Sequence, residues 1–243
     1  GIAVHALVDS RMGGNAALKQ QVEAAGIECI TGSAVIGTHG YLGLNSVDIA
    51  PISDDGRTVT GDAWNLSCDF LAISGGWSPN VHLHSHAGGR PVYNEDITAF
   101  IPGESRQSER SAGAGAGAFA LSECLIQGAV AGAEAATLLG FNAKPMETPT
   151  NDASAVVPVK ALWRVPGPGK KYVDLQDDVT SSDVELAHRE GYISVEHLKR
   201  YTTLGMGTDQ GKTSNMNGHA IMAEERGASI EAVGTTMFRP PYN

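Results

Sequence analysis

An apolar run at residues 70–73 passes directly into Ser74, Gly75 and Gly76. Four apolar residues bounded by small ones are typical of a strand buried on both faces, as in a parallel sheet covered by helices. The glycines let the backbone pass close to a neighbouring element or a ligand, and Pro79 ends the strand. We therefore predict an α/β fold with residues 70–73 buried in its sheet, although an ordinary strand end has the same pattern.

The composition predicts a globular protein with neither nucleic acid nor membrane among its partners. The chain has 243 residues, 42% of them hydrophobic, and a formal net charge of −10, which argues against binding to polyanions or acidic membranes. Cys29, Cys68 and Cys124 lie far apart, so we expect no disulfide framework and a cytoplasmic location. No apolar run approaches the roughly 20 residues that a membrane helix needs.

Residues 1–9 form a predicted strand that ends in Asp9. In dinucleotide-binding folds, an acid at the end of the second strand binds the adenosine ribose. Residues 1–9 fit that strand, with the first strand and its glycine-rich turn absent from this sequence. The alternative is that Asp9 simply ends the strand and caps the turn at residues 10–14.

The next elements match the end of an NAD-type domain. Asn15 is the predicted N-cap of a helix that stops at Gly26. A short strand at residues 27–30 follows. Segments 44–51 and 58–66 then form a predicted β-meander around a turn at residues 53–57.

Histidines alternate at His82, His84 and His86, which on a strand would place three imidazoles on one face. Zinc is one interpretation, because neutral imidazole is a good zinc ligand. No acid or cysteine lies at a usual partner spacing. We therefore favour an exposed polar face and predict no metal site.

Glycine and alanine dominate residues 111–121, before a predicted helix that runs to about residue 139. Glycines at a strand-to-helix junction let phosphate or ring atoms approach the backbone, and the helix start offers unpaired N–H groups to an anion. The alternative is that these small residues only permit close helix packing. The candidate cofactor contacts here are Gly113, Ala114, Gly115, Phe119 and Leu121.

A polar linker at residues 146–154 and a strand-like arm at residues 155–163 precede a run of short helices. Thr180 and Asp183 predict a capping box for the first helix, and Ser194 caps the second. Two more helices are predicted near residues 217–226 and 229–233.

Cations surround the Gly-Met-Gly turn at residues 205–207. Lys199, Arg200 and Lys212 could converge with free backbone N–H groups on a phosphate. A solvated helix end explains Lys199 and Arg200 equally well. The further candidate contacts of this loop are Thr203, Met206 and Gln210.

Two motifs resemble those of flavoprotein reductases with two dinucleotide-binding domains of the FAD/NAD(P)-type Rossmann class. Residues 70–80 are similar to the segment h-h-x-A-T-G-x-x-P-N, and the resemblance makes Ser74 and Gly75 cofactor contacts. Residues 111–121 resemble the closing strand and helix of the same reductases. The acid of that family is replaced near Ala114, which argues against a full FAD site and favours a different dinucleotide.

Residues 195–212 resemble the helical [2Fe–2S] module of the bacterioferritin-associated ferredoxin type. The four cysteine positions of that module hold Asp174, Gln176, Asp209 and Ser214 in this chain. A cluster needs thiolates, so the resemblance implies a small all-α module without a cluster.

Taken together, residues 173–180, 199–215 and 236–242 resemble the α subunit of heterotetrameric sarcosine oxidases. The resemblance implies bound NAD, FMN at the interface with a β subunit that also carries FAD, and partner subunits β, γ and δ. The family enzyme oxidises sarcosine to glycine, producing formaldehyde or methylene-tetrahydrofolate and hydrogen peroxide. The resemblance also implies that this chain is an internal piece that is inactive alone, with tetrahydrofolate bound in a missing C-terminal domain.

The resemblances divide the chain into four parts. Residues 1–80 are a partial NAD-type domain, 81–145 the closing strand and helix of the main dinucleotide domain, 146–171 a linker, and 172–243 the helical module. No nucleophile–base pair or paired carboxylate stands out, so we predict no catalytic residue. The alternatives are a non-catalytic assembly module with a degenerate nucleotide fold, or a subunit of a related FAD-dependent amine or opine dehydrogenase.

Overall fold

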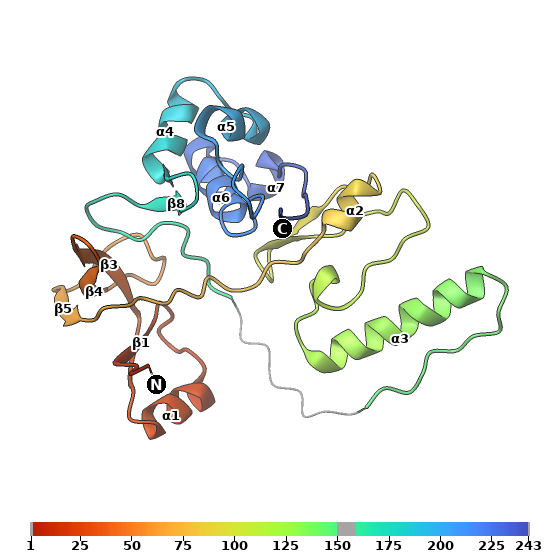
Figure 1. The fold of residues 1–243 in the computed structure, drawn as a ribbon, viewed down its shortest axis with the longest axis horizontal. Helices are drawn as coiled ribbons and strands as arrows, with labels where there is room; N and C mark the ends of the chain where they lie inside the picture. Colours follow the sequence, from red (N-terminus) through yellow and green to blue (C-terminus); the bar gives the residue numbers. More distant parts are fainter. Residues whose placement is uncertain (1, 150–158, 243) are drawn as a thin grey trace. The chain divides into compact units, whose positions relative to one another are not determined.

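The computed structural model describes residues 2–149 and 159–242. The chain divides into two compact units (Figure 1). The first contains residues up to 75 together with 160–171, and the second contains 76–159 and the segment from 172 onward. Each unit is described by itself below.

A strand, a helix and a second strand open the first unit. β1 (Ala6–Asp9) pairs in parallel with β2 (Glu28–Thr31), and α1 (Ala16–Ala24) connects them. The Asn15 side chain accepts hydrogen bonds from the N–H groups of Ala17 and Leu18, both at 3.1 Å. The predicted strand–helix–strand order and the Asn15 cap are confirmed.

An antiparallel sheet completes the first unit. Its strands, in spatial order, are β3 (Ser33–Gly40), β4 (Leu44–Pro51) and β5 (Trp64–Ser67). Val47, Ile49 and Ala50 of β4 are buried, because the central strand packs its side chains against the rest of the unit. The predicted meander is confirmed, although its last strand is shorter than expected.

Residues 70–73 form no strand, and the prediction of a buried strand there is wrong. The side chains of Phe70, Ile73 and Trp77 are 70%, 79% and 80% exposed. A strand needs a neighbour that pairs with its backbone N–H and C=O groups. Among the described strands, none pairs with residues 70–80, so local apolar character alone did not produce one.

The second unit begins with α2 (His82–His86) and the hairpin of β6 (Val92–Asn94) and β7 (Ala99–Ile101). The 3₁₀ turn η1 (Gly113–Ala116) and α3 (Leu121–Leu138) follow. The strand predicted for the alternating histidines is wrong, because Ser85 and Ala87 donate their N–H groups to carbonyls four residues back. On the helix His84 is buried while His86 is exposed, so the three imidazoles do not share a face.

The helical module, residues 172–242, contains a short hairpin and four helices. The hairpin pairs β8 (Tyr172–Asp174) with β9 (Val179–Thr180), so the expectation of a wholly α module is wrong in this detail. The hairpin turns the chain into α4, and its last residue caps that helix. The four helices are α4 (Ser181–Arg189), α5 (Val195–Thr202), α6 (Asn215–Arg226) and α7 (Ile230–Val233).

Local caps and a buried helix organise this module. Thr180 and Asp183 exchange hydrogen bonds in the predicted capping box of α4. The Ile221 and Met222 side chains of α6 are fully buried, as is Leu198 of α5. Burying apolar side chains of this size stabilises a fold by about 1.5–3 kcal/mol each, so α6 is the core helix of the module.

Residues 150–158 of the predicted linker and arm lie outside the described residues. The neighbouring residues 142–149 and 159–163 form neither helix nor strand. Within residues 2–149 and 159–242, no helix combines the length and apolar character needed to cross a membrane.

Candidate functional site

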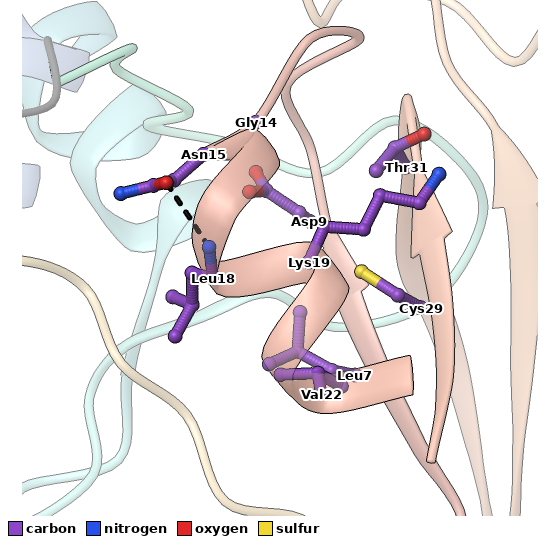
Figure 2. A pocket seen from close by; sticks show the side chains of 9 residues that line it. All are labelled: Leu7, Asp9, Gly14, Asn15, Leu18, Lys19, Val22, Cys29 and Thr31. Carbon is purple, nitrogen blue, oxygen red and sulfur yellow. Dashed lines mark hydrogen bonds between the residues drawn. The ribbon is translucent and has the colours of Figure 1, made fainter. Parts of the chain in front are cut away.

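Asp9 lies at a small cavity at the carboxyl end of β1, which we call the acidic notch (Figure 2). Its volume is about 20 Å³, enough for a single water molecule. The notch therefore presents polar groups at an edge and does not enclose a ligand. The residues that line it come from β1, α1, β2 and the loop before α1: Leu7, Asp9, Gly14, Asn15, Leu18, Lys19, Val22, Cys29 and Thr31.

The Asp9 carboxylate is bound by Arg11. It accepts hydrogen bonds from the Arg11 backbone N–H at 2.9 Å, from Nε at 2.9 Å and from a terminal guanidinium nitrogen at 2.7 Å. The side-chain bonds from Arg11 hold the pKa of Asp9 below its ordinary value, against the opposite effect of burial. Asp9 is therefore an ionised carboxylate at neutral pH. The local turn bond expected in the alternative interpretation is present, and the role of Arg11 was missed from the sequence.

Ser74 and Gly75 lie outside the lining of the acidic notch. Both are exposed in the irregular segment that follows β5. Their assignment as cofactor contacts remains a prediction.

The turn η1 uses its polar groups internally. The Gly113 N–H donates to Gln127 Oε1 at 2.9 Å, and the Ala118 N–H donates to the Gly113 carbonyl. A Cβ at Gly113 would lie 3.4 Å from the Cys124 side chain, whereas nothing lies within 4 Å of one at Gly115. That contact is an ordinary one, and the left-handed φ of +64° at Gly113 is what favours glycine there. Gly115 borders open space. Of the neighbouring candidates, Ala114 and Leu121 are exposed and Phe119 is half-buried.

Gly115→Val tests whether this open space is a binding surface. We expect the variant to keep its fold, because no described atom lies near the added side chain, but to retain less bound NAD if a ligand approaches this backbone. Circular dichroism and the NAD content of the purified protein are the two measurements. Loss of the fold together with the ligand would favour a packing role for this glycine.

Lys199 of α5, Lys212 of the loop between α5 and α6, and Arg239 of the C-terminal segment form a group that we call the cation cluster. Burial and the Arg239 guanidinium lower the pKa of Lys199, while Glu196 opposes that shift. Burial also lowers the pKa of Lys212, the Asp209 carboxylate opposes this, and the Lys199 ammonium adds to it. The positive charges therefore lie close enough to repel one another, which an anion would relieve.

The C-terminal segment is fastened onto Lys212. The Lys212 ammonium donates a hydrogen bond to the Arg239 carbonyl and lies 6.0 Å from the centre of the Phe238 ring. The Tyr242 N–H donates to the Thr208 carbonyl at 2.8 Å. Lys212 is thus held in place by contacts that bring Arg239 to the cluster.

The Arg200 guanidinium also adds to the lowering of the Lys199 pKa, after burial and Arg239, but Arg200 has an acidic neighbour on its own helix. It is exposed on α5, with a terminal nitrogen 3.8 Å from Glu196. Thr203 adopts a left-handed conformation with φ 68° at the end of α5, Met206 is exposed, and the Gln210 amide donates to the Gly207 carbonyl at 2.9 Å. The Gln210 amide therefore stabilises the turn.

Two histidines accompany the cation cluster. His219 of α6 is 1% exposed, and no described residue gives either of its ring nitrogens a hydrogen-bond partner. Burial and the Lys199 ammonium lower the pKa of His219 to about 4, so its imidazole is neutral at pH 7. Burial and the Lys212 ammonium lower the pKa of His82. Sequence reasoning missed Arg239, His82 and His219, because only the fold brings them to the lysines.

The buried imidazole predicts acid sensitivity of the helical module. The unfolded chain protonates this side chain near pH 6.5 and the folded chain only near pH 4, so acidification between these values draws protons onto the unfolded state. Each pH unit in that window costs about 1.4 kcal/mol, and we expect roughly 2 kcal/mol lower stability at pH 5 than at pH 7.5. Urea unfolding of His219→Met should show a flatter pH dependence than the parent. His86→Gln, at an exposed position, is the control and should leave the slope unchanged.

The four positions that hold cysteine in the ferredoxin module are brought together here by hydrogen bonds. Asp174 Oδ2 accepts from the Gly205 N–H at 2.8 Å and from Ser214 Oγ at 3.0 Å. Gln176 Oε1 accepts from Thr208 Oγ1 at 3.0 Å and from the Asp209 N–H at 3.4 Å. These oxygen atoms therefore fasten the loop that carries Lys212.

In the described part of the chain, no group of three or more histidine, cysteine, aspartate or glutamate side chains could hold a metal ion. The absence of an iron–sulfur cluster from the purified protein remains a prediction, which iron and sulfide analysis would test.

Comparison with known proteins gives one consistent result along the chain. Residues 168–243 match the sarcosine oxidase A3 domain. The chain is 37% identical to the sarcosine oxidase subunit alpha of Rhizobium meliloti (strain 1021), over 100% of this chain and 23% of the relative. It is 36% identical to the same subunit of Corynebacterium sp. (strain P-1), over 98% of this chain and 25% of the relative. The chain thus spans about a quarter of these relatives, and the resemblance to sarcosine oxidase α subunits is confirmed.

A solved structure agrees at the level of the fold. The crystal structure of L-proline dehydrogenase from P. horikoshii aligns with 99% of this chain and 49% of its own, with a TM-score of 0.66 and 19% sequence identity. This likeness shows an α/β fold that both proteins share.

Proposed function

Because this chain matches sarcosine oxidase α subunits along its whole length, we propose that it is part of the α subunit of a flavin-dependent oxidase that demethylates sarcosine. The products are glycine, hydrogen peroxide, and formaldehyde or methylene-tetrahydrofolate. The partners are the β, γ and δ subunits, with FAD in β and tetrahydrofolate bound elsewhere in the longer α subunit. The role of these residues is to bind cofactors and a partner subunit.

The cation cluster is the structural observation that supports a cofactor-binding role. In a chain with a formal net charge of −10, the Lys212 ammonium binds the Arg239 carbonyl. Burial lowers the pKa of both Lys199 and Lys212, and the Arg239 guanidinium adds to the shift of Lys199 while the Lys199 ammonium adds to that of Lys212. A phosphate monoester fits such a group, because it accepts several charge-assisted hydrogen bonds and offsets the repulsion.

We assign the phosphate of FMN to this cluster, at the interface with β. The bound flavin would carry electrons between redox partners. The chain's own residues would hold it: Lys199 and Lys212 as ammonium donors and Arg239 as a planar guanidinium donor. The Asp174 and Gln176 hydrogen bonds hold the loop that presents Lys212.

NAD is the second proposed cofactor, with the acidic notch as its ribose contact. β1, α1 and β2 have the order and parallel pairing that a Rossmann-type unit requires. The ionised Asp9 lies at the carboxyl end of β1 and fits a ribose hydroxyl donor. Residues 113–121 are proposed as a separate contact region.

Mass analysis of the ligands released from the assembled complex tests the function. We expect FMN, FAD and NAD, and FMN should be lost when the Lys199 and Lys212 ammonium groups are both removed. A yellow complex that releases FAD but no FMN would contradict the assignment of the cation cluster.

A colourless complex that still captures β would support the alternative of a degenerate assembly module. Two observations favour that alternative enough to test it. Asp9 is already bonded to Arg11, and the acidic notch holds only about 20 Å³.

A further inference from the structure

The C-terminal segment at residues 236–242, which we call the strap, crosses the loop between α5 and α6 at three points. Each point is a hydrogen bond between one residue of the strap and one residue of the loop or of the start of α6: Thr236 with Asn215, Arg239 with Lys212, and Tyr242 with Thr208. Residue numbers rise along the strap while those of its partners fall. The strap and the loop therefore run antiparallel.

The bond between Asn215 and Thr236 sets the register of the strap on the loop. Arg239 and Tyr242 contribute a backbone carbonyl and a backbone N–H to their bonds, and such groups are present all along a chain. Asn215 Nδ2 instead donates to Thr236 Oγ1 at 3.2 Å. Slippage of the strap by one residue would offer new backbone groups to the loop but would move this hydroxyl away from Asn215. The side-chain bond thus decides which strap residue lies beside Lys212.

The Asn215 side chain is itself held by the loop. It is buried, and a Cβ atom at Gly205 or at Gly211 would collide with its amide. The two glycines have left-handed φ values of +71° and +75°, so the loop backbone closes around the amide where a side chain would not fit. Asn215 is also the first residue of α6, the core helix of the module. It therefore joins the core helix, the loop and the strap.

An asparagine at this position lowers the stability of the module. No described residue donates a hydrogen bond to Asn215 Oδ1, although this atom is buried. A buried acceptor without a donor destabilises a fold, whereas replacing both partners of a bond by apolar groups of the same shape is nearly neutral. A role in the site therefore explains the polar pair of Asn215 and Thr236 better than a contribution to stability does.

We propose that Asn215 and Thr236 are positioning residues, which hold Arg239 beside Lys212 in the arrangement that a phosphate needs. The inference rests on the proposed assignment of the FMN phosphate to the cation cluster. Charge-assisted bonds from a guanidinium to a phosphate depend on the geometry of the donors. A strap that slides along the loop would present the Arg239 guanidinium away from the phosphate for part of the time.

Asn215→Leu combined with Thr236→Val tests this role, because it replaces both partners of the bond by apolar side chains of similar shape. FMN and riboflavin, which lacks the phosphate, are titrated into the flavin-depleted complex and followed by flavin fluorescence. We expect the preference for FMN over riboflavin to fall at least roughly tenfold, with the affinity for riboflavin unchanged. The urea midpoint of the same complex should stay the same or rise, since the unpaired oxygen is removed.

Single variants identify the group that is responsible. Thr236→Val should also lower the preference for FMN, whereas Thr236→Ser keeps the hydroxyl and should bind both flavins as the parent does. Thr235→Val is the matched control, because the Thr235 hydroxyl donates to the Thr236 carbonyl within the strap. Asn217→Leu, on the same helix as Asn215, is the control for the asparagine. Both controls should leave the preference unchanged.

An unchanged preference for FMN in the folded double variant would overturn the inference. A lower urea midpoint together with an equal loss of affinity for both flavins, in the double variant and in Thr236→Val, would overturn it as well, because that pattern belongs to a purely structural contact. A parent complex that binds FMN no more tightly than riboflavin would instead overturn the assignment of the FMN phosphate to the cation cluster.

Discussion

Lys212→Ala in the assembled complex should weaken FMN retention roughly tenfold to a hundredfold and leave the NAD content unchanged. A charge-assisted contact to a phosphate is worth about 1.5–3 kcal/mol, which corresponds to that range of dissociation constants. The ammonium of Lys212 is held by the Arg239 carbonyl, so its position does not depend on the ligand. Dialysis followed by flavin quantification gives the result directly.

Three further variants separate phosphate binding from other roles of Lys212. Lys199→Ala should also weaken flavin retention. Among the described residues, the bond to the Arg239 carbonyl comes from Lys212, so the Lys199 variant removes a cation without releasing the C-terminal segment. Arg200→Ala should have a smaller effect, because Arg200 is exposed and lies beside Glu196. Lys144→Ala, at an exposed position of the second unit, is the charge control. If Lys212→Ala lowered the melting temperature but released no flavin, Lys212 would only fasten the C-terminal segment.

The second large effect is expected at Asp174, whose carboxylate is 1% exposed. Asp174→Ala should lower the free energy of unfolding by roughly 4 kcal/mol, because it leaves the buried Gly205 N–H and Ser214 hydroxyl without an acceptor. Each buried donor left unpaired costs about 1–3 kcal/mol, and the Gln176 N–H loses its acceptor as well. Urea unfolding followed by circular dichroism is the measurement.

Asp177→Ala is the matched control, since Asp177 is an exposed aspartate in the turn between β8 and β9. It should change stability by less than about 0.5 kcal/mol. Asp174→Asn keeps one acceptor oxygen and should fall between the two. Equal stability of the Asp174→Ala and Asp177→Ala variants would show that the loop holds its shape without the buried carboxylate. Loss of flavin along with stability in Asp174→Ala would connect this network to the cation cluster.

Asp9 is a negative site and the cation cluster is a positive one, and they differ in how far apart their residues lie in the sequence. Asp9 and Arg11 are two residues apart, so a single turn brings them together. Lys199, Lys212 and Arg239 are spread over the last fifth of the chain, and the hydrogen bonds of the loop and the C-terminal segment gather them. Substitutions that loosen this segment should therefore affect the cluster, while the Asp9–Arg11 pair should withstand them.

The capped starts of α1 and α4 followed from the sequence, whereas α2 was not predicted as a helix and Ser194, the predicted cap of α5, makes no side-chain cap hydrogen bond. Asn15, Thr180 and Ser229 each accept a hydrogen bond from a backbone N–H two or three residues later. Each cap hydrogen bond joins residues that are close in the sequence, so the local sequence is enough to predict it. The parallel order of β1, α1 and β2 was predictable for a similar reason, because a helix between two neighbouring strands returns the chain to the same end of the sheet.

What only the tertiary structure decided depends on groups far apart in the chain. Residues 70–73 are apolar enough for a strand, but none of the described strands pairs with them. The alternating histidines became a helix because i→i−4 hydrogen bonds satisfy that backbone locally and His84 is buried on one side. Lys199 and Lys212 were visible as cations in the sequence, whereas Arg239, His82 and His219 join them only through the fold. A strand needs a neighbouring strand that pairs with its backbone, and a cluster of charges needs side chains from distant residues to come together. Both depend on the folded chain and not on any single stretch of sequence.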